Sequence, residues 1–324
     1  MRDVRAIAGS GSGRLLGTSV EFMAAFGRET TDRPGGTPGR GDLERLFGRR
    51  FALIGMIHLL PLPGSPRFVP ERGMAEVVRR ATEEARLLVD AGFDGLIVEN
   101  GWDIPFLKPD DIGPETPAAM AVATAEVARA VGVPLGVNCL ANAVDRSLAV
   151  AAATGARFVR SNQWANAYVA NEGLVEGRAG LMTRYRRAIG AEHVTVWADV
   201  QVKLGSHAIT ADRSLTDQAR DAAWFDADAL IVTGTRLGDA PLTDHLETVR
   251  AATDLPLVAG SGVRVENLAD VVPHADGAIV GSSIKSGGVW HGRIDRGVCE
   301  RLSAARDELE KRFEDSGPSD NLSD

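Results

Sequence analysis

The amino-acid sequence predicts an α/β protein that folds as a closed (β/α)8 TIM barrel with a flexible N-terminal extension. Eight short apolar runs alternate with helical segments, which is typical of a parallel sheet with right-handed crossovers. The eight units take up about 270 residues, close to the usual size of this barrel. Polar or glycine residues follow every apolar run, as expected where the carboxyl ends of barrel strands carry the chemistry.

The elements follow one another in a regular order. Apolar runs without polar alternation suit parallel strands that are covered on both faces, and they lie at 51–57, 95–98, 134–137, 157–160, 194–198 and 229–232 and within 255–263 and 277–285. Helices are predicted at 74–91, 117–131, 141–154, 175–189, 214–225 and 243–252, with a short helix before the eighth strand and a closing helix at 295–313. An open doubly wound sheet is the rival fold, but no Gly-x-Gly-x-x-Gly turn follows an early strand.

Composition divides the chain into three parts. Residues 1–44 are predicted to be a flexible extension, because the end of this segment is rich in Gly, Pro and Thr and reads as a linker. Residues 45–313 form the barrel. Residues 314–324 are acidic, contain Gly and Pro, and are predicted to be a disordered tail.

Charge and cysteine content exclude several classes of protein. The 324 residues carry a formal net charge of −8, which argues against a nucleic-acid polymer as partner. The only cysteines, Cys139 and Cys299, show no metal-ligand spacing, so neither a disulfide scaffold nor a structural zinc site is expected. No apolar run reaches the roughly 18 residues of a membrane span, and no secretory signal is seen. We therefore expect a cytoplasmic protein, and a homo-oligomer is a reasonable expectation for this fold.

Two Gly/Ser turns follow the last two strands and predict a phosphate site. In this barrel the loops after strands seven and eight often bind phosphate, through backbone N–H groups at helix starts. For Lys285, the alternative is an ordinary solvated lysine at the surface. The expected phosphate-binding residues are Gly234, Gly260, Ser261, Gly262, Gly281, Ser282 and Lys285.

Three residues at strand ends are the catalytic candidates. His58 precedes a Pro-rich loop, and its alternative is a hydrogen-bonded structural histidine. Glu99 directly follows an apolar run, where poor solvation would raise its pKa and suit a general acid or base; the alternative is an ion pair with Arg160 or Lys203. Asp199 is likewise either a general acid or base or a member of an ion pair. We expect no required cofactor; the alternative is that Glu99 and Asp199 hold Mg²⁺, which binds carboxylates together with substrate phosphate.

Further polar residues at the strand ends are expected to bind the substrate. Amide side chains supply donors and acceptors without titrating. Lys203 has three readings: an electrophile, a phosphate partner or a Schiff-base amine. The full set is Asn100, Asn138, Asn142, Arg160, Asn162, Lys203 and Thr233.

Several of these segments resemble the BtpA/SgcQ family over about residues 50–305. The most specific is the run His-Leu-Leu-Pro-Leu-Pro-Gly-Ser-Pro at 58–66, and the others lie at 96–100, 136–138, 198–203, 231–234, 260–262 and 279–285. The family usually has a histidine after the equivalent of Lys203, whereas here three residues precede His207. The resemblance implies a phosphate-binding TIM barrel.

The resemblance leaves the activity open. The founding role of the family is photosystem I biogenesis, while other members look like enzymes of sugar or nucleoside metabolism. Our first hypothesis is an enzyme that acts on a phosphorylated sugar or a nucleoside or nucleotide, by glycosidic cleavage or transfer or as an isomerase or lyase. The alternatives are a non-catalytic assembly or stability factor for a photosystem-type complex, and a metal-dependent hydrolase.

Overall fold

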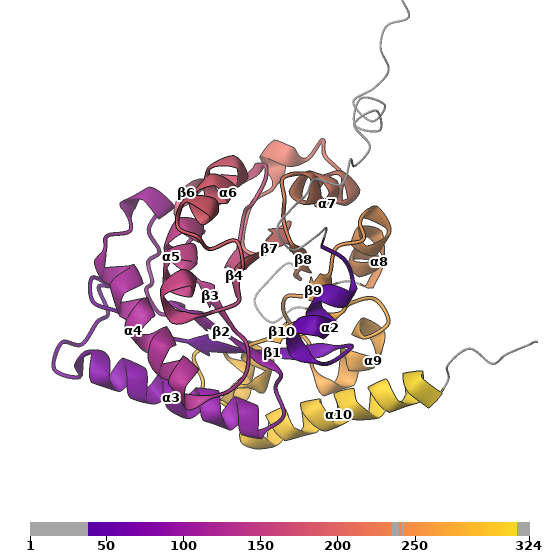
Figure 1. Ribbon diagram of the computed structural model, residues 1–324, viewed down its shortest axis with the longest axis horizontal. Coiled ribbons are helices and arrows are strands. Elements are labelled where there is room, and N and C mark those ends of the chain that lie inside the picture. Colours follow the sequence, from indigo (N-terminus) through magenta and orange to yellow (C-terminus); the bar gives the residue numbers. More distant parts are fainter. Residues whose placement is uncertain (1–37, 235–239, 242, 316–324) are drawn as a thin grey trace, which may run out of the picture. The chain divides into compact units, whose positions relative to one another are not determined.

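The protein is represented by a computed structural model that describes residues 38–234, 240–241 and 243–315. Most of the predicted extension over 1–44 and of the predicted tail over 314–324 lies outside the described residues. Eight parallel strands close into a barrel in the order β1–β10–β9–β8–β7–β4–β3–β2, as Figure 1 shows. The predicted (β/α)8 barrel is confirmed. The strands are β1 (Ala52–His58), β2 (Gly95–Glu99), β3 (Leu135–Asn138), β4 (Phe158–Ser161), β7 (Thr195–Val200), β8 (Ala229–Val232), β9 (Leu257–Ala259) and β10 (Gly277–Val280).

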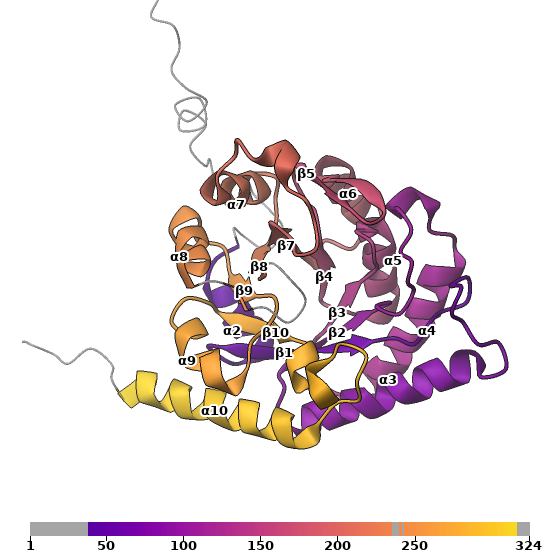
Figure 2. The same ribbon diagram turned by 180° about the vertical axis from the view of Figure 1, so that it is seen from behind.

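Helices surround the barrel and follow the strands in the predicted alternation. Both ribbon views place α3 and α10 side by side along one edge (Figures 1 and 2). Between β9 and β10 the helical segment is reduced to a 3₁₀ turn and one α-helical turn. The helices are α2 (Gly41–Phe47), α3 (Gly73–Asp90), α4 (Glu115–Ala130), α5 (Val144–Thr154), α6 (Ala179–Ala188), α7 (Leu215–Trp224), α8 (Thr243–Ala252), α9 (Leu268–Val271) and α10 (Arg296–Asp315).

The barrel interior is filled by an apolar core of its own. Because side chains alternate along a strand, every second residue faces the interior and the others face the helices. The interior cluster includes Ile54, Met56, Ile97, Phe158, Trp197, Ile231 and Ile279, and a larger cluster packs between strands and helices. At its centre the rings of Phe158 and Trp197 stack with their centroids 3.8 Å apart. This aromatic layer excludes water from the middle of the barrel.

Helix α2 covers the amino-terminal end of the barrel. Its Leu43 belongs to the interior cluster, and the ring of Phe47 meets the rings of Phe158 and Trp197 edge-on, each at 6.1 Å. Gly95 makes room for this contact, since a Cβ atom there would lie 2.4 Å from the Phe47 ring. The boundary that the sequence predicts between residues 44 and 45 falls within α2.

The structure departs from the predicted elements after the fourth strand. The segment predicted to be a polar insertion followed by a helix over 175–189 contains an antiparallel hairpin of β5 (Ala167–Ala170) and β6 (Gly173–Glu176). Val175 is buried in this hairpin beside Tyr168, and α6 therefore begins only at Ala179. The residues of the two strands, Ala-Tyr-Val-Ala and Gly-Leu-Val-Glu, do not alternate between apolar and polar, so no strand period marks the hairpin in the sequence.

Two other boundaries also shift, and both concern candidate residues. The fifth barrel strand extends to Val200 rather than to 198, because Asp199 and Val200 continue the pairing with β8. Asp199 thus lies inside a strand. The helix predicted from 141 begins at Val144, and Asn142 takes a left-handed conformation with φ 54° before it. Asn142 therefore belongs to a loop.

The remaining global features agree with the composition. Among the described residues, no helix is both long enough and apolar enough to cross a membrane. Cys139 and Cys299 are both buried as free thiols, and burial raises the pKa of each thiol to about 12. Neither side chain therefore supplies a reactive thiolate near neutral pH.

Candidate active site

A layer of polar side chains lies at the carboxyl ends of the strands, directly above the apolar interior. Strand alternation places His58 two residues beyond Met56, and Glu99 two residues beyond Ile97, on the same inward face. The register of β1, β2 and β3 then sets His58 beside Glu99 and Glu99 beside Asn138. Arg160 and Asp199 occupy the matching inward positions above the stacked rings of β4 and β7, so charged groups rest on an aromatic floor.

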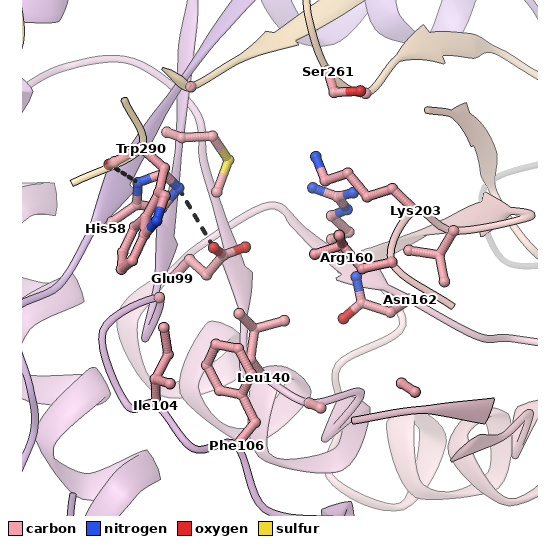
Figure 3. Close-up of a pocket in the computed structure, with 18 of the residues that line it drawn as sticks. His58, Glu99, Ile104, Phe106, Leu140, Arg160, Asn162, Lys203, Ser261 and Trp290 are labelled. Atoms are coloured by element: carbon pink, nitrogen blue, oxygen red, sulfur yellow. Dashed lines mark hydrogen bonds and ion pairs between the residues drawn. The ribbon is translucent and has the colours of Figure 1, made fainter. Parts of the chain in front are cut away.

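A cavity of about 430 Å³ opens at this end of the barrel. Its size is within the usual range for small-molecule sites. Figure 3 shows Glu99 and His58 on one side, with Arg160 and Lys203 ending beside one another on the other side and Ser261 beyond them. The cavity thus has a carboxylate side and a cationic side.

Ten of the candidate residues line the cavity and seven do not. Those on the wall are His58, Glu99, Arg160, Asn162, Lys203, Gly260, Ser261, Gly262, Gly281 and Ser282. Those behind the wall are Asn100, Asn138, Asn142, Asp199, Thr233, Gly234 and Lys285. The second group contacts the first or holds the loops that form the wall, as the hydrogen bonds below show.

Asp199 is engaged by neighbouring side chains. Arg160 donates to its carboxylate from Nε at 3.2 Å and from Nη2 at 3.0 Å, and Asn162 Nδ2 donates at 3.1 Å. The Asp199 side chain is completely buried. Its carboxylate therefore holds Arg160 and Asn162 in place, and these two side chains face the cavity.

One carboxylate oxygen of Glu99 accepts a short hydrogen bond, and the other has only a longer contact. Asn138 Nδ2 donates to Glu99 Oε2 at 2.7 Å, while Oε1 lies 3.5 Å from His58 Nε2. Burial raises the pKa of Glu99 above its ordinary 4.5, and the positive charge of Arg160 opposes the shift. A carboxyl group with a raised pKa is suited to general acid and base catalysis.

His58 is neutral and is oriented by a buried lysine. Lys285 Nζ lies 2.8 Å from His58 Nδ1, and the carbonyl oxygen of Trp290 lies 3.3 Å from the same nitrogen. Burial, and then the charge of Lys285, lower the pKa of His58 to about 3. Because an ammonium group can only donate, we assign Nδ1 as the acceptor of the shorter contact. The proton of the ring then lies on Nε2 and points towards Glu99.

Lys203 enters the cavity from the loop after β7. Its backbone N–H donates to Thr233 Oγ1 at 3.1 Å, which ties the backbone of Lys203 to the residue that follows β8. Burial, and then the adjacent Arg160 guanidinium, lower the pKa of Lys203 from 10.5 to about 8. Within the described part of the chain, its Nζ has no hydrogen bond or ion pair. Of the alternatives weighed for Glu99, the pair with Lys203 is therefore not formed, and Arg160 pairs with Asp199 instead.

Asn100 and Asn142 brace the loops that form the cavity wall. Asn100 Oδ1 accepts from the Leu140 N–H at 2.6 Å, and its Nδ2 donates to the Leu140 carbonyl at 3.1 Å. Asn142 makes the corresponding pair of bonds to the backbone of Gln163, both at 3.0 Å. Leu140 lines the cavity, so these amides position the wall without reaching the interior.

The two Gly/Ser loops lie side by side on the wall. Ser283 Oγ donates to the Val263 carbonyl at 2.6 Å and links them, while Ser261 Oγ accepts from the Gly234 N–H at 3.1 Å. Ser282 begins a short 3₁₀ turn. In the part of the chain that the structure describes, the backbone N–H groups of Ser282 and Ser283 have no backbone acceptor.

Several cavity residues were not anticipated. They come from loops far apart in the sequence, and most are aromatic or apolar: Ile104, Phe106, Leu140, Tyr168 and Trp290. Trp290 packs against Trp102 with ring centroids 5.0 Å apart and also covers His58. The run Gly-Gly-Val-Trp at 287–290, in the loop after the last strand, was the available signal. Tyr168 had no such signal, because its position depends on the hairpin.

The two candidate carboxylates do not face a common point. Asp199 is taken up by Arg160 and Asn162, and Glu99 by Asn138 and His58. Across the described residues, no cluster of three or more His, Cys, Asp or Glu side chains is placed to hold a metal ion.

Comparison with known proteins identifies relatives over most of the chain. A sequence model of the BtpA family matches residues 49–307. An uncharacterized protein of Archaeoglobus fulgidus is 40% identical over 73% of this chain and 92% of its own length. The photosystem I biogenesis protein BtpA of Synechocystis is 35% identical over 79% and 87%. An uncharacterized Caenorhabditis elegans protein described as mitochondrial is 35% identical over 79% and 93%.

Solved structures agree on the fold. Tryptophan synthase of M. tuberculosis, in its open form, superposes with a TM-score of 0.51 over 79% of this chain and 92% of its own. The two sequences are 19% identical. A likeness at this level supports the barrel architecture and carries nothing about the reaction.

The Arg160–Asp199 pair generates a stability prediction. Asp199→Ala leaves the Arg160 guanidinium buried and uncompensated, so we expect the free energy of unfolding to fall by about 3–5 kcal/mol. The double variant Arg160→Met, Asp199→Ala should lose clearly less, because neither charge of the pair is left without its partner. Urea unfolding of Asp199→Ala, Arg160→Met and the double variant measures this. Additive losses in the double variant would contradict the pairing.

A second prediction concerns the pH dependence of stability. The pKa of Lys203 is about 8 in the folded protein and 10.5 ordinarily, so the unfolded chain binds more protons between these values and stability rises with pH there. Lys203→Met removes this contribution and should raise the free energy of unfolding at pH 7 by about 2 kcal/mol, discounted for partial exposure. The gap to the wild type should close by pH 10.5. A gap that stays constant with pH would refute the prediction.

Proposed function

Because the chain belongs to the BtpA family and its barrel opens into a charged cavity, we propose that it is an enzyme acting on a phosphorylated sugar or a nucleoside or nucleotide. One observation carries the proposal. A carboxyl group with a raised pKa faces, across one cavity, two cationic side chains and two Gly/Ser loops. This combination suits a small anionic ligand with a reacting centre at its other end.

The phosphate group of the ligand would lie at the Gly/Ser loops. The N–H groups of Ser282 and Ser283 point to no backbone acceptor among the described residues, and N–H groups of this kind bind phosphate oxygens well. Arg160 lines the same cavity and would add positive charge. Lys285, by contrast, lies behind His58, so in this proposal it acts on the histidine and does not contact phosphate.

The reacting end of the ligand would lie beside Glu99. Burial raises its pKa, which makes its protonated form easier to populate and suits proton transfer to and from a ligand. The N–H of neutral His58 points towards it. Asp199 is assigned a positioning role, since it is enclosed by Arg160 and Asn162. Glycosidic cleavage or transfer and isomerase or lyase chemistry all use such a proton transfer.

The non-catalytic alternative has support in the name of the Synechocystis relative, a photosystem I biogenesis protein. A factor of that kind would need a partner surface and no perturbed titratable groups in a cavity. The shifted pKa values of Glu99 and Lys203 therefore favour the enzyme. The metal-dependent hydrolase would need ligands that converge, and Glu99 and Asp199 are held by other side chains. A cytoplasmic location and homo-oligomeric assembly stay proposals.

Substitution of Gly281 tests the phosphate site. A Cβ atom there would meet Met56 and His58 only at ordinary contact distances of 3.5 and 3.6 Å, so Gly281→Ala should fold while its methyl group narrows the cavity. We expect calorimetry with ribose 5-phosphate and nucleoside monophosphates to find a ligand for the wild type. Its affinity should fall at least about tenfold, or 1.4 kcal/mol, in Gly281→Ala.

The matched control is Gly180→Ala, the same substitution on α6, where the nearest atom would be 3.5 Å away on a flexible arginine. It should bind like the wild type. If no phosphorylated ligand of the panel binds the wild type, the proposed function is wrong. Equal binding by Gly281→Ala would refute the placement of the phosphate.

A further inference from the structure

We propose that Lys203 is a nucleophile that forms a Schiff base with an aldehyde or ketone carbonyl of the phosphorylated ligand. This inference rests on the proposed function and narrows it to ligands with a carbonyl group. It also selects isomerase or lyase chemistry over glycosidic cleavage, because an iminium ion acts by withdrawing electrons from the neighbouring carbon.

The first support is the placement of the amine. Lys203 lines the cavity, and Figure 3 shows its side chain ending beside Arg160 and facing the space between the two sides. Its backbone is fixed by the bond to Thr233 Oγ1. The residues on either side of this loop position, Gln201 and Leu204, have left-handed backbone conformations with φ 53° and 66°. Such conformations in non-glycine residues are typical of functional sites.

The second support is that Asp199 and Glu99, the carboxylates whose charge acts on Lys203, are already engaged. Asp199 is bound by Arg160 and Asn162, and Glu99 is bound by Asn138. No ion pair among the described residues therefore fixes a proton on Lys203. A positively charged neighbour and a desolvated site are the two conditions that free a lysine amine for attack, and Arg160 supplies the first.

The magnitude of the effect is large enough to matter. With a pKa of about 8, about one Lys203 amine in ten is unprotonated at pH 7, against about one in three thousand for an ordinary lysine. Burial, and then the charge of Arg160, lower this pKa, while Asp199 and Glu99 oppose the shift. The neutral amine is thus available without any further change in the protein.

Lys285 provides an internal contrast. Burial also lowers its pKa to about 8, but its Nζ lies 2.8 Å from His58 Nδ1 and it does not line the cavity. A lowered pKa alone therefore does not distinguish the two lysines. The two lysines differ in access to the ligand, because Lys203 lines the cavity and Lys285 does not.

The reaction balances with groups that line the cavity. The Lys203 nitrogen lone pair forms a bond to the carbonyl carbon, the C=O π pair moves to oxygen, and the proton released from nitrogen passes to that oxygen. Glu99 in its protonated form then donates a proton to the hydroxyl group, the C–O bond breaks, and water leaves as C=N forms. The Glu99 carboxylate that results is a base for a proton on the adjacent carbon. Hydrolysis reverses these steps and restores the amine.

Reductive trapping tests the inference. The protein is incubated with dihydroxyacetone phosphate and sodium cyanoborohydride, and the product is digested and analysed by mass spectrometry. The chain has four lysines, Lys108, Lys203, Lys285 and Lys311, so the modified residue can be assigned directly. We expect one adduct, on Lys203, with the mass of the ligand less one oxygen atom. Lys203→Met should reduce labelling at least tenfold, and Lys311→Met, at an exposed position on α10, should not.

Glycerol 3-phosphate, which has the phosphate but no carbonyl, separates this inference from the proposed function. If it binds by calorimetry while dihydroxyacetone phosphate leaves Lys203 unmodified, the Schiff base is wrong and a phosphate site stands. If neither compound binds, and no ribose phosphate or nucleoside monophosphate of the earlier panel binds either, the proposed function fails as well. An adduct on Lys285, Lys108 or Lys311 in place of Lys203 would also overturn the inference. Peptide mapping of the wild type decides the question independently of Lys203→Met.

Discussion

The chemistry of this protein depends on a layer of apolar and aromatic side chains that keeps water away from the charged side chains above it. Phe158 and Trp197 stack inside the barrel, and α2 covers them from the amino-terminal side through Phe47. Charged groups placed two residues further along the same strands lose most of their hydration. Each must then find a partner, become neutral or carry a shifted pKa. All three outcomes are seen here.

The partners divide the polar layer into positioning and reacting groups. Arg160 and Asp199 satisfy one another, and the neutral His58 accepts from Lys285. Glu99 and Lys203 both face the cavity and both have shifted pKa values. Among the described residues, neither has a partner of opposite charge that would fix its protonation state. In a binding scaffold such groups would only reduce stability, whereas in an enzyme they are the acid, base and nucleophile. The same physical constraint that destabilises the layer therefore supports its proposed use.

Much of the fold could be predicted from sequence, because eight apolar runs with a regular spacing leave few alternatives. The strand-end rule also brought His58, Glu99, Arg160 and Lys203 to one edge. The sequence could not predict which side chains on neighbouring strands contact one another. Asp199 binds Arg160 and not the cavity space because of the way β4 pairs with β7. The hairpin that carries Tyr168 was missed, because its two four-residue strands have no apolar–polar alternation, and the segment was interpreted as a polar insertion and the start of a helix.

The most direct test of this account is the pKa of Lys203 itself. With four lysines in the chain, ¹⁵N-labelled lysine gives few side-chain amine signals, and Lys203→Met identifies the one that matters. Titration by NMR should show the Lys203 amine losing its proton near pH 8. A pKa near the ordinary 10.5 would mean that water reaches the charged side chains. It would contradict the exclusion of water on which the proposed chemistry rests.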